Sequence, residues 1–153
     1  ISPTSLQLEI TETTLMENPK RTIKILDGLY GLGLHLAIDD FGTGYSSLSY
    51  LKNLSFNEIK IDKSFVMDMQ NNPDDATIVQ SIIDLGQTLN LAVTAEGVET
   101  QEQLAFIRQL GCDEAQGYLF SKPPACPFSA SVALSLAASV AFSCTAPLLR
   151  SDV

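Results

Sequence analysis

The chain has 153 residues and a mass of 16.5 kDa, which fits one domain or part of one and excludes a multidomain enzyme. A composition with 45% hydrophobic and 18% charged residues is typical of a globular domain and excludes a disordered chain. The formal net charge of −9 and the pI near 4.3 exclude duplex nucleic acid as a partner, because nothing in such a chain would displace the duplex's counterions.

The first predicted elements are short strands that alternate with helical patterns from residue 5 to about residue 117. The predicted strands are 5–10, 34–38, 58–62, 91–95 and 114–116. Asn18-Pro19 and Asn72-Pro73 each predict a helix with an Asn cap and Pro at the first helical position. A short helix is expected over 46–52. In the helix that follows Asn72-Pro73, one apolar stripe is expected from Ile78, Ile82, Leu85 and Leu89. Thr100 and Gln103 form a capping-box pattern that predicts a further helix, which Gly111 ends.

Alternating strands and helices predict parallel β/α units with right-handed crossovers. Five strands are too few for an eight-stranded barrel, which needs about 250 residues. The chain therefore fits an incomplete C-terminal portion of a (β/α) TIM-like barrel, with about five β/α units. An open flavodoxin-like sheet is the competing fold.

The tail differs in character from the rest, which suggests a division into 1–123 and 124–153. From Pro123 to Leu149 the sequence holds no charged residue and is rich in Ala, Ser, Leu and Val. A terminal helix that packs on the sheet is the favoured interpretation, because serines dilute the hydrophobicity and prolines bracket the segment. A membrane segment and an altered C-terminus are the alternatives.

Cys112, Cys126 and Cys144 are odd in number and lack the Cys-x-x-Cys spacing, so they predict neither a disulfide framework nor a zinc site. Unpaired thiols suit a reducing, cytoplasmic compartment. The start Ile-Ser-Pro has no signal-peptide pattern, and we expect the chain to be a piece of a longer polypeptide.

Each predicted strand ends in a polar residue. These residues are Glu9, Asp39 with Asp40, Lys60, Glu96 and Gln116. In a β/α barrel the C-terminal ends of the strands converge on one mouth, where carboxylates repel one another unless a cation lies among them. Oxygen ligands without thiolates or imidazoles indicate Mg²⁺, Mn²⁺ or Ca²⁺, and adjacent carboxylates at Asp39-Asp40 suit a two-metal site.

Each of these residues also has a simpler interpretation. Glu9 alone fits an exposed strand residue, and Asp39-Asp40 before Phe-Gly-Thr-Gly fits turn chemistry. His35, the only histidine, is interpreted as structural. The occurrence of all the polar strand ends in register favours the site.

Five segments together resemble the EAL-domain phosphodiesterases. They are Glu9-Ile10-Thr11-Glu12, Asp39-Asp40-Phe41-Gly42-Thr43-Gly44-Tyr45-Ser46-Ser47-Leu48, Lys60-Ile61-Asp62, Ala95-Glu96-Gly97-Val98-Glu99 and Gln116-Gly117-Tyr118. The resemblance runs from about Ser5 to Pro123. It implies a β/α barrel that hydrolyses cyclic di-GMP to linear pGpG with Mg²⁺ or Mn²⁺ in a two-metal site, and with Ca²⁺ as an inhibitory ion.

The resemblance also implies the roles of individual residues. Glu9, Asp39 and Asp40 are expected to ligate metal, Lys60 to hold the attacking water, and Glu96 to act as general base or to organise water. Five further residues are expected to bind substrate or support the site. They are Glu12, which steadies the loop of the Asp-Phe-Gly-Thr-Gly motif, and Glu99, Gln116, Phe41 and Gly42.

Two ligands of the family are absent from the sequence: the Glu of the Glu-Ala-Leu motif and the Asn of the following strand. We therefore expect the chain alone to be weakly active or inactive. A catalytically inert module that binds cyclic di-GMP or a protein is the alternative function. The expected partners are cyclic di-GMP, a second copy in a homodimer of the intact domain, and sensor or GGDEF-type domains in a parent protein that is cytoplasmic or membrane-anchored.

Overall fold

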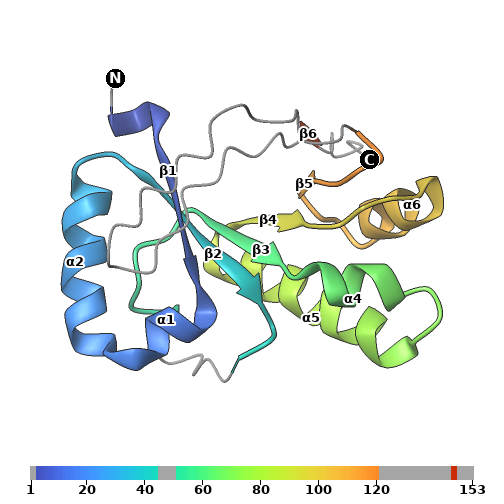
Figure 1. Cartoon of the computed structure of the whole chain (residues 1–153), viewed down its shortest axis with the longest axis horizontal. Coiled ribbons are helices and arrows are strands. Elements are labelled where there is room, and N and C mark those ends of the chain that lie inside the picture. Colours follow the sequence, from blue (N-terminus) through green and yellow to red (C-terminus); the bar gives the residue numbers. More distant parts are fainter. Residues whose placement is uncertain (1–2, 45–50, 121–145, 148–153) are drawn as a thin grey trace, which may run out of the picture.

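One β-sheet organises the residues that the computed structural model describes, which are 3–44, 51–120 and 146–147 (Figure 1). The strands are β1 (Gln7–Thr11), β2 (His35–Phe41), β3 (Glu58–Ile61), β4 (Ala92–Ala95), β5 (Glu114–Ala115) and β6 (Ala146–Pro147). β1 to β5 are parallel, each paired with the next along the chain, and β6 is antiparallel to β5.

This strand order distinguishes the two predicted folds. In a β/α barrel each parallel strand lies beside its predecessor, whereas a flavodoxin-like sheet reverses direction at a switch point and has the order 2-1-3-4-5. The order β1-β2-β3-β4-β5 contains no such reversal. The barrel-type prediction is confirmed, and the flavodoxin-like alternative is excluded.

Helices connect the strands. They are a 3₁₀ turn η1 (Pro3–Ser5), α1 (Glu12–Glu17), α2 (Pro19–Gly31), α4 (Lys63–Asp68), α5 (Pro73–Leu89) and α6 (Gln101–Gln109). The predicted caps are confirmed: the side chains of Asn18 and Asn72 accept hydrogen bonds from backbone amides at the starts of α2 and α5. Thr100 and Gln103 form the complete capping box at α6.

Two short helices, α1 and α4, were missed from the sequence. Both begin directly after a strand, where a side chain caps the first turn: Thr11 accepts from the Thr14 amide, and Asp62 accepts from the Ser64 amide. The first strand also begins at Gln7 rather than Ser5, because η1 occupies Pro3–Ser5. Most of the predicted helix 46–52 lies outside the described residues.

The buried face of α5 is rotated from the predicted stripe. Ile78, Ile82, Leu85 and Leu89 were expected to share one face, whereas the buried residues are Val79, Ile82, Ile83 and Gly86. The helix turns its narrowest side toward the sheet because Gly86 permits a close approach to Val93 of β4. Ile78 and Leu85 then lie at the edge of the contact, only half-buried.

The two faces of the sheet differ in chemistry. On one face Leu36, Ile38, Ile59 and Ile61 are fully buried and belong to the hydrophobic core beneath the helices. Side chains alternate along a strand, so the intervening residues point the other way. They include the buried Glu9, Glu58, Lys60 and Thr94, which make the opposite face polar. In a β/α barrel this is the interior, where sites are built.

Most of the tail prediction falls on residues 121–145 and 148–153, which lie outside the described residues, as do Cys126 and Cys144. Within the described part, residues 146–147 pair with β5. No described helix is both long enough and apolar enough to cross a bilayer.

Cys112 is a free thiol whose burial raises its pKa to about 12.

The contact between α5 and β4 can be tested with two glycines in helices. A Cβ at Gly86 would lie 2.2 Å from Val93 Cγ2, whereas a Cβ at Gly28 in α2 would meet nothing within 4 Å. We expect Gly86→Ala to lower the free energy of unfolding by about 1–3 kcal/mol through overpacking. The control Gly28→Ala should raise it by about 0.5–1 kcal/mol, because Ala is the better helix former. Urea unfolding measures both, and equal effects would contradict the close approach.

Candidate functional site

Lys60 is the centre of the polar face. Its side chain is only 2% exposed, and its Nζ lies 2.7 Å from Glu9 Oε1, 2.6 Å from Glu96 Oε1 and 3.9 Å from Asp39 Oδ1. These residues come from β1, β2, β3 and the end of β4. The structure thus brings together four of the polar strand ends that the sequence singled out.

Burial and charge act in opposite directions on this group. Burial would lower the pKa of Lys60, but the hydrogen bonds from its ammonium to Glu9 and Glu96 outweigh burial and raise the pKa above its usual value. For Glu96 burial dominates and raises the pKa of the carboxyl, although Lys60 opposes that shift. Lys60 is therefore a fixed positive charge, and Glu96 is a carboxylate that holds a proton more readily than an ordinary glutamate.

A β-bulge explains how Asp39 and Asp40 reach the same site. Neighbouring strand residues normally point to opposite faces. Here Ile38 pairs with Ile59 and Phe41 pairs with Ile61, so two residues of β2 lie opposite the single residue Lys60. Asp40 adopts a left-handed conformation with φ of 51°, which Asp tolerates better than most residues.

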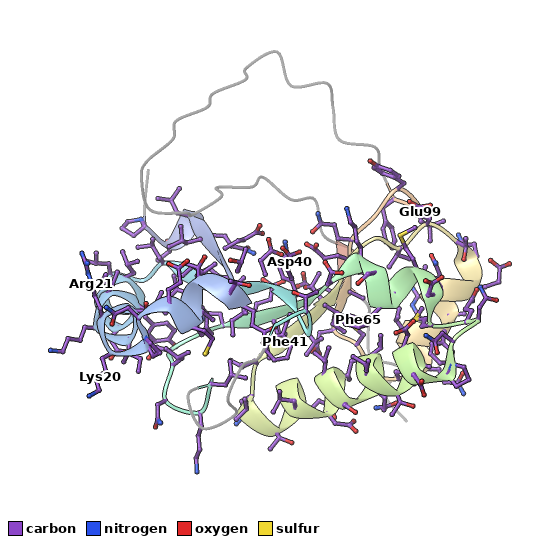
Figure 2. All side chains as sticks on the ribbon, turned by 60° about the horizontal axis from the view of Figure 1, so that its bottom comes forward. Lys20, Arg21, Asp40, Phe41, Phe65 and Glu99 are labelled. Carbon is purple, nitrogen blue, oxygen red and sulfur yellow. The ribbon has the colours of Figure 1, made fainter. Side chains whose placement is uncertain are left out.

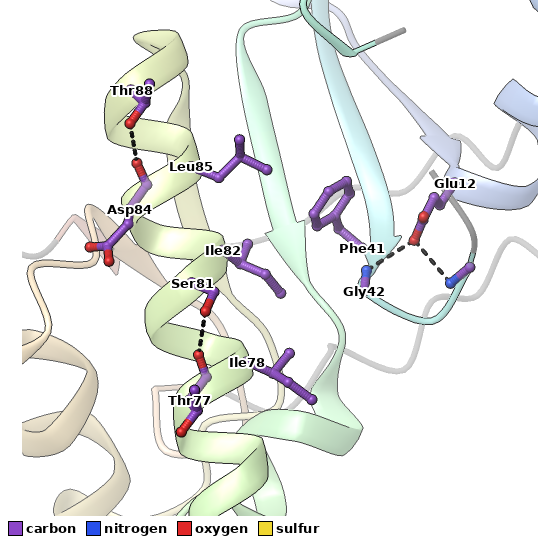
Figure 3. Close-up of a pocket in the computed structure, with 11 residues that line it drawn as sticks. Glu12, Phe41, Gly42, Thr77, Ile78, Ser81, Ile82, Asp84, Leu85 and Thr88 are labelled. Atoms are coloured by element: carbon purple, nitrogen blue, oxygen red, sulfur yellow. Dashed lines mark hydrogen bonds between the residues drawn. The ribbon is translucent and has the colours of Figure 1, made fainter. Parts of the chain in front are cut away.

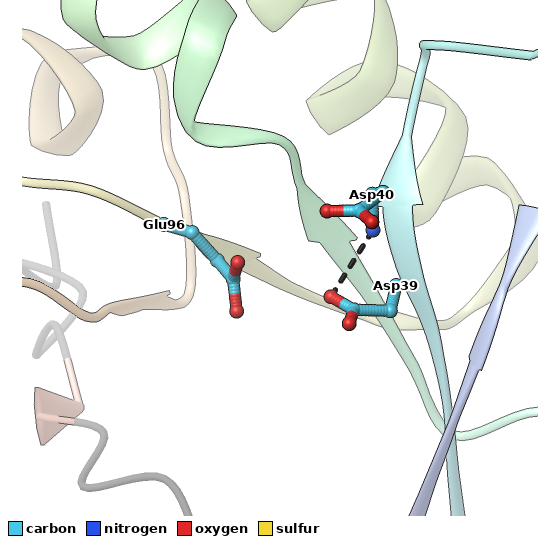
Figure 4. A group of neighbouring side chains, drawn as sticks. All are labelled: Asp39, Asp40 and Glu96. Carbon is cyan, nitrogen blue, oxygen red and sulfur yellow. Dashed lines mark hydrogen bonds between the residues drawn. The ribbon is translucent and has the colours of Figure 1, made fainter. Parts of the chain in front are cut away.

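The result is a compact group of oxygen ligands. Asp39, Asp40 and Glu96 each offer a carboxylate oxygen, and these oxygens all lie within 4.8 Å of one another (Figure 4). Their spacing and the purely carboxylate chemistry fit a hard divalent cation such as Mg²⁺ or Mn²⁺. Glu9 is not part of this group; its carboxylate bonds Lys60 Nζ at 2.7 Å.

The raised pKa of Asp40 also fits a site for a divalent cation. Partial burial, followed by repulsion from Asp39 and a side-chain hydrogen bond with Asp62, raises the pKa of Asp40. The pKa of Asp62 is lowered despite its burial, because Ser64 donates hydrogen bonds to it. A bound cation would relieve the repulsion between Asp39 and Asp40.

Glu12 holds the loop that follows β2. It is buried, and its Oε2 accepts hydrogen bonds of 3.0 Å from the amides of both Gly42 and Gly44 (Figure 3). The same close-up shows a pocket between this loop and α5. Its lining includes Glu12, Phe41, Gly42, Ile78, Ile82 and Leu85. Glu12, Phe41 and Gly42 therefore line one pocket together with residues of α5.

The loop that carries Glu96 is fixed by its backbone. The amide of Glu96 donates to Ile61 O, at 3.2 Å. Gly97 has φ of 74°, and a Cβ there would lie 2.6 Å from Lys63 Cβ. A larger residue at this position would push the loop away from α4, so Gly97 keeps Glu96 close to Lys60.

Glu99 and Gln116 differ in their placement. Glu99 is exposed in the loop before α6. Figure 2 shows it apart from Asp40, at the end of the molecule opposite to Lys20 and Arg21 of α2. Gln116 follows β5, where its Oε1 is buried with no hydrogen-bond partner among the described residues. That oxygen is an acceptor available to a ligand.

Asp62, Glu58 and Gln7 also belong to this polar system, and sequence reasoning missed them. Asp62 was counted as the end of a strand, although an Asp before a helix is also a capping signal. Glu58 accepts from Gln7 and Thr94 and is 4% exposed. Its alternation with Lys60 along β3 was the available signal, because residues two apart share a face.

The fold and the site define a β/α-barrel domain with a carboxylate and lysine centre at the C-terminal ends of its strands. The family model of the EAL domain matches residues 1–123. The chain belongs to the EAL domain family.

Two curated relatives come from Pseudomonas aeruginosa. The bifunctional diguanylate cyclase/cyclic di-GMP phosphodiesterase MucR is 48% identical over 134 residues, which are 87% of this chain and 20% of that protein. The cyclic di-GMP phosphodiesterase NbdA is 53% identical over 118 residues, which are 77% of this chain and 15% of that protein. The chain thus spans a fifth or less of the length of these relatives.

Solved structures agree in fold. The PaMucR phosphodiesterase in its c-di-GMP complex has a TM-score of 0.79 at 48% identity, over 82% of this chain and 51% of that one. BlrP1 of Klebsiella pneumoniae, in a complex with manganese and cyclic di-GMP, has a TM-score of 0.74 at 37% identity, over 80% of this chain and 31% of that one.

The central pairing of Lys60 can be tested by Lys60→Met. The change removes the ammonium partner of the buried Glu9 and the partly buried Glu96, so we expect the free energy of unfolding to fall by about 3 kcal/mol at pH 7. The loss of Lys60 further raises the pKa of Glu96 in the folded state, and a carboxyl with a raised pKa destabilises the fold increasingly as pH rises from its unfolded value of about 4.3. The deficit should therefore be smaller at pH 5 than at pH 7.

Urea unfolding at the two pH values measures this deficit, and Lys52→Met, at an exposed position, is the matched control. A deficit that grows on acidification would contradict the described role of Lys60.

Proposed function

We propose that this chain forms part of a metal-dependent phosphodiesterase domain that hydrolyses cyclic di-GMP to linear pGpG. The observation that carries the proposal is the convergence of Glu9, Asp39 and Glu96 on the buried Lys60. Relatives named as cyclic di-GMP phosphodiesterases add support from outside the chain.

The proposed metal ligands are Glu9, Asp39 and Asp40, with Glu96 beside them. A divalent cation bound there would polarise the phosphodiester and favour the deprotonated form of a bound water. We propose Mg²⁺ or Mn²⁺ as the activating ion and Ca²⁺ as an inhibitory one. Complexes of BlrP1 with manganese and with calcium support the choice of divalent cations.

The chain's own residues supply the remaining chemistry. Lys60 presents a permanent positive charge, which attracts the anionic phosphate and orients a water beside it. Glu96 has a raised pKa, which suits a group that takes up the proton of the attacking water. Gln116 offers an unpartnered amide oxygen to a donor on the substrate. Glu12 holds the loop next to Asp40.

We further propose a cytoplasmic active site, as cyclic di-GMP is an intracellular messenger, and a homodimer for the intact domain. The protein named as bifunctional diguanylate cyclase and phosphodiesterase supports the proposal that additional signalling domains share the parent chain.

The test is a joint measurement of binding and turnover. Calorimetry follows the binding of cyclic di-GMP with and without Mn²⁺, and chromatography follows the appearance of pGpG. We expect metal-dependent turnover that is slow in the chain by itself, and a loss of about 10²–10⁴-fold in Glu96→Gln with binding retained. Glu102→Gln, in the exposed first turn of α6, is the control and should leave the rate unchanged.

Binding without turnover would favour a catalytically inert cyclic di-GMP-binding module. The absence of both binding and turnover would contradict both functions.

A further inference from the structure

Glu58, the first residue of β3, is a further carboxylate buried on the same face of the sheet as Lys60. Glu58 is 4% exposed, and its carboxylate contacts no lysine or arginine within ion-pair distance in the described part of the chain. Its Oε1 accepts from Thr94 Oγ1 at 2.5 Å, and its Oε2 from Gln7 Nε2 at 3.1 Å, with His35 Nε2 3.4 Å away. A carboxylate surrounded by several donors acts as a hydrogen-bond acceptor.

Gln7 connects the Glu58 carboxylate to Glu9 of the candidate site. In the sheet register Glu9 pairs with Ala37 and Ala37 pairs with Glu58, so the small, fully buried Ala37 separates the two acidic side chains. The same Gln7 Nε2 that bonds Glu58 lies 3.5 Å from Glu9 Oε1.

The hydrogen bond to the Glu58 carboxylate determines which end of the Gln7 amide faces Glu9. An amide presents either an oxygen acceptor or an NH₂ group with two donors. Because Glu58 Oε2 and Glu9 Oε1 are both acceptors, only the NH₂ end of the amide is favourable between them. The second N–H of that group is therefore directed at Glu9.

Both donors of Glu9 act on one oxygen. Lys60 Nζ and Gln7 Nε2 both donate hydrogen bonds to Glu9 Oε1, and neither donates to Glu9 Oε2. Hydrogen-bond partners of this kind fix the orientation of metal ligands, and their loss commonly lowers metal affinity 10–100-fold.

We propose that Glu58 is a positioning residue which, through Gln7, orients the Glu9 carboxylate so that Oε2 is presented to the cation. The part of the proposal that concerns the cation rests on the proposed function. Glu58 and Gln7 touch neither the substrate nor the metal, and they act only through Glu9.

The first arm of the test follows the Gln7 side-chain amide by nuclear magnetic resonance in the full chain, with Gln7→Leu to assign its signals. We expect Glu58→Gln to speed the exchange of the Gln7 NH₂ protons with solvent about tenfold, because a bond to a charged acceptor is lost. The pair Gln80–Asp84 on α5 has the same chemistry at 2.8 Å, so Asp84→Asn is the matched control and should leave Gln7 unchanged.

The second arm measures Mn²⁺ affinity by electron paramagnetic resonance, beside thermal unfolding. We expect Glu58→Gln and Gln7→Leu each to weaken Mn²⁺ binding about tenfold or more, with no change in Asp84→Asn. Unchanged exchange at Gln7, or lower stability without a loss of affinity, would overturn the positioning role. If the unaltered chain bound no Mn²⁺, the proposed function would fail, and the amide exchange would still decide whether Glu58 orients Gln7.

Discussion

The ammonium group of Lys60 is the constraint on which the polar face of the sheet depends. A buried charge is costly unless it is paired, and here two carboxylates contact it within 2.7 Å. Each partner comes from a different strand or strand end, so the ion pairs exist only when β1, β3 and β4 are in register. The same pairs allow Glu9 and Glu96 to remain close together without a metal, and they concentrate charge where the strands end.

Irregular backbone geometry places side chains in the site that a regular alternating strand would direct elsewhere. Consecutive residues of a regular strand would send Asp39 and Asp40 to opposite faces, and the bulge opposite Lys60 brings both to the site. Gly97 and the buried Glu12 fix the two adjoining loops in a similar way. The site therefore depends on departures from regular structure, placed on a regular sheet.

Sequence reasoning recovered the features that follow from periodicity and caps. Strand order, the three capped helices and the convergence of the polar strand ends all come from local patterns that the structure repeats. It missed α1 and α4, which are too short to show a helical period, and it rotated the buried face of α5 because Gly86 carries no hydrophobic signal. It also missed Glu58 and Gln7, since their importance lies in contacts across strands, such as that between residues 7 and 58.

The central proposal is that the carboxylates of β1, β2 and the end of β4 gather around Lys60 and hold a divalent cation. The most direct measurement is anomalous diffraction from crystals of this chain grown with Mn²⁺. We expect a manganese peak within ligand distance of Asp39 and Asp40, with Glu96 beside it. A peak elsewhere on the molecule, with this group of carboxylates unligated at saturating Mn²⁺, would contradict the proposal.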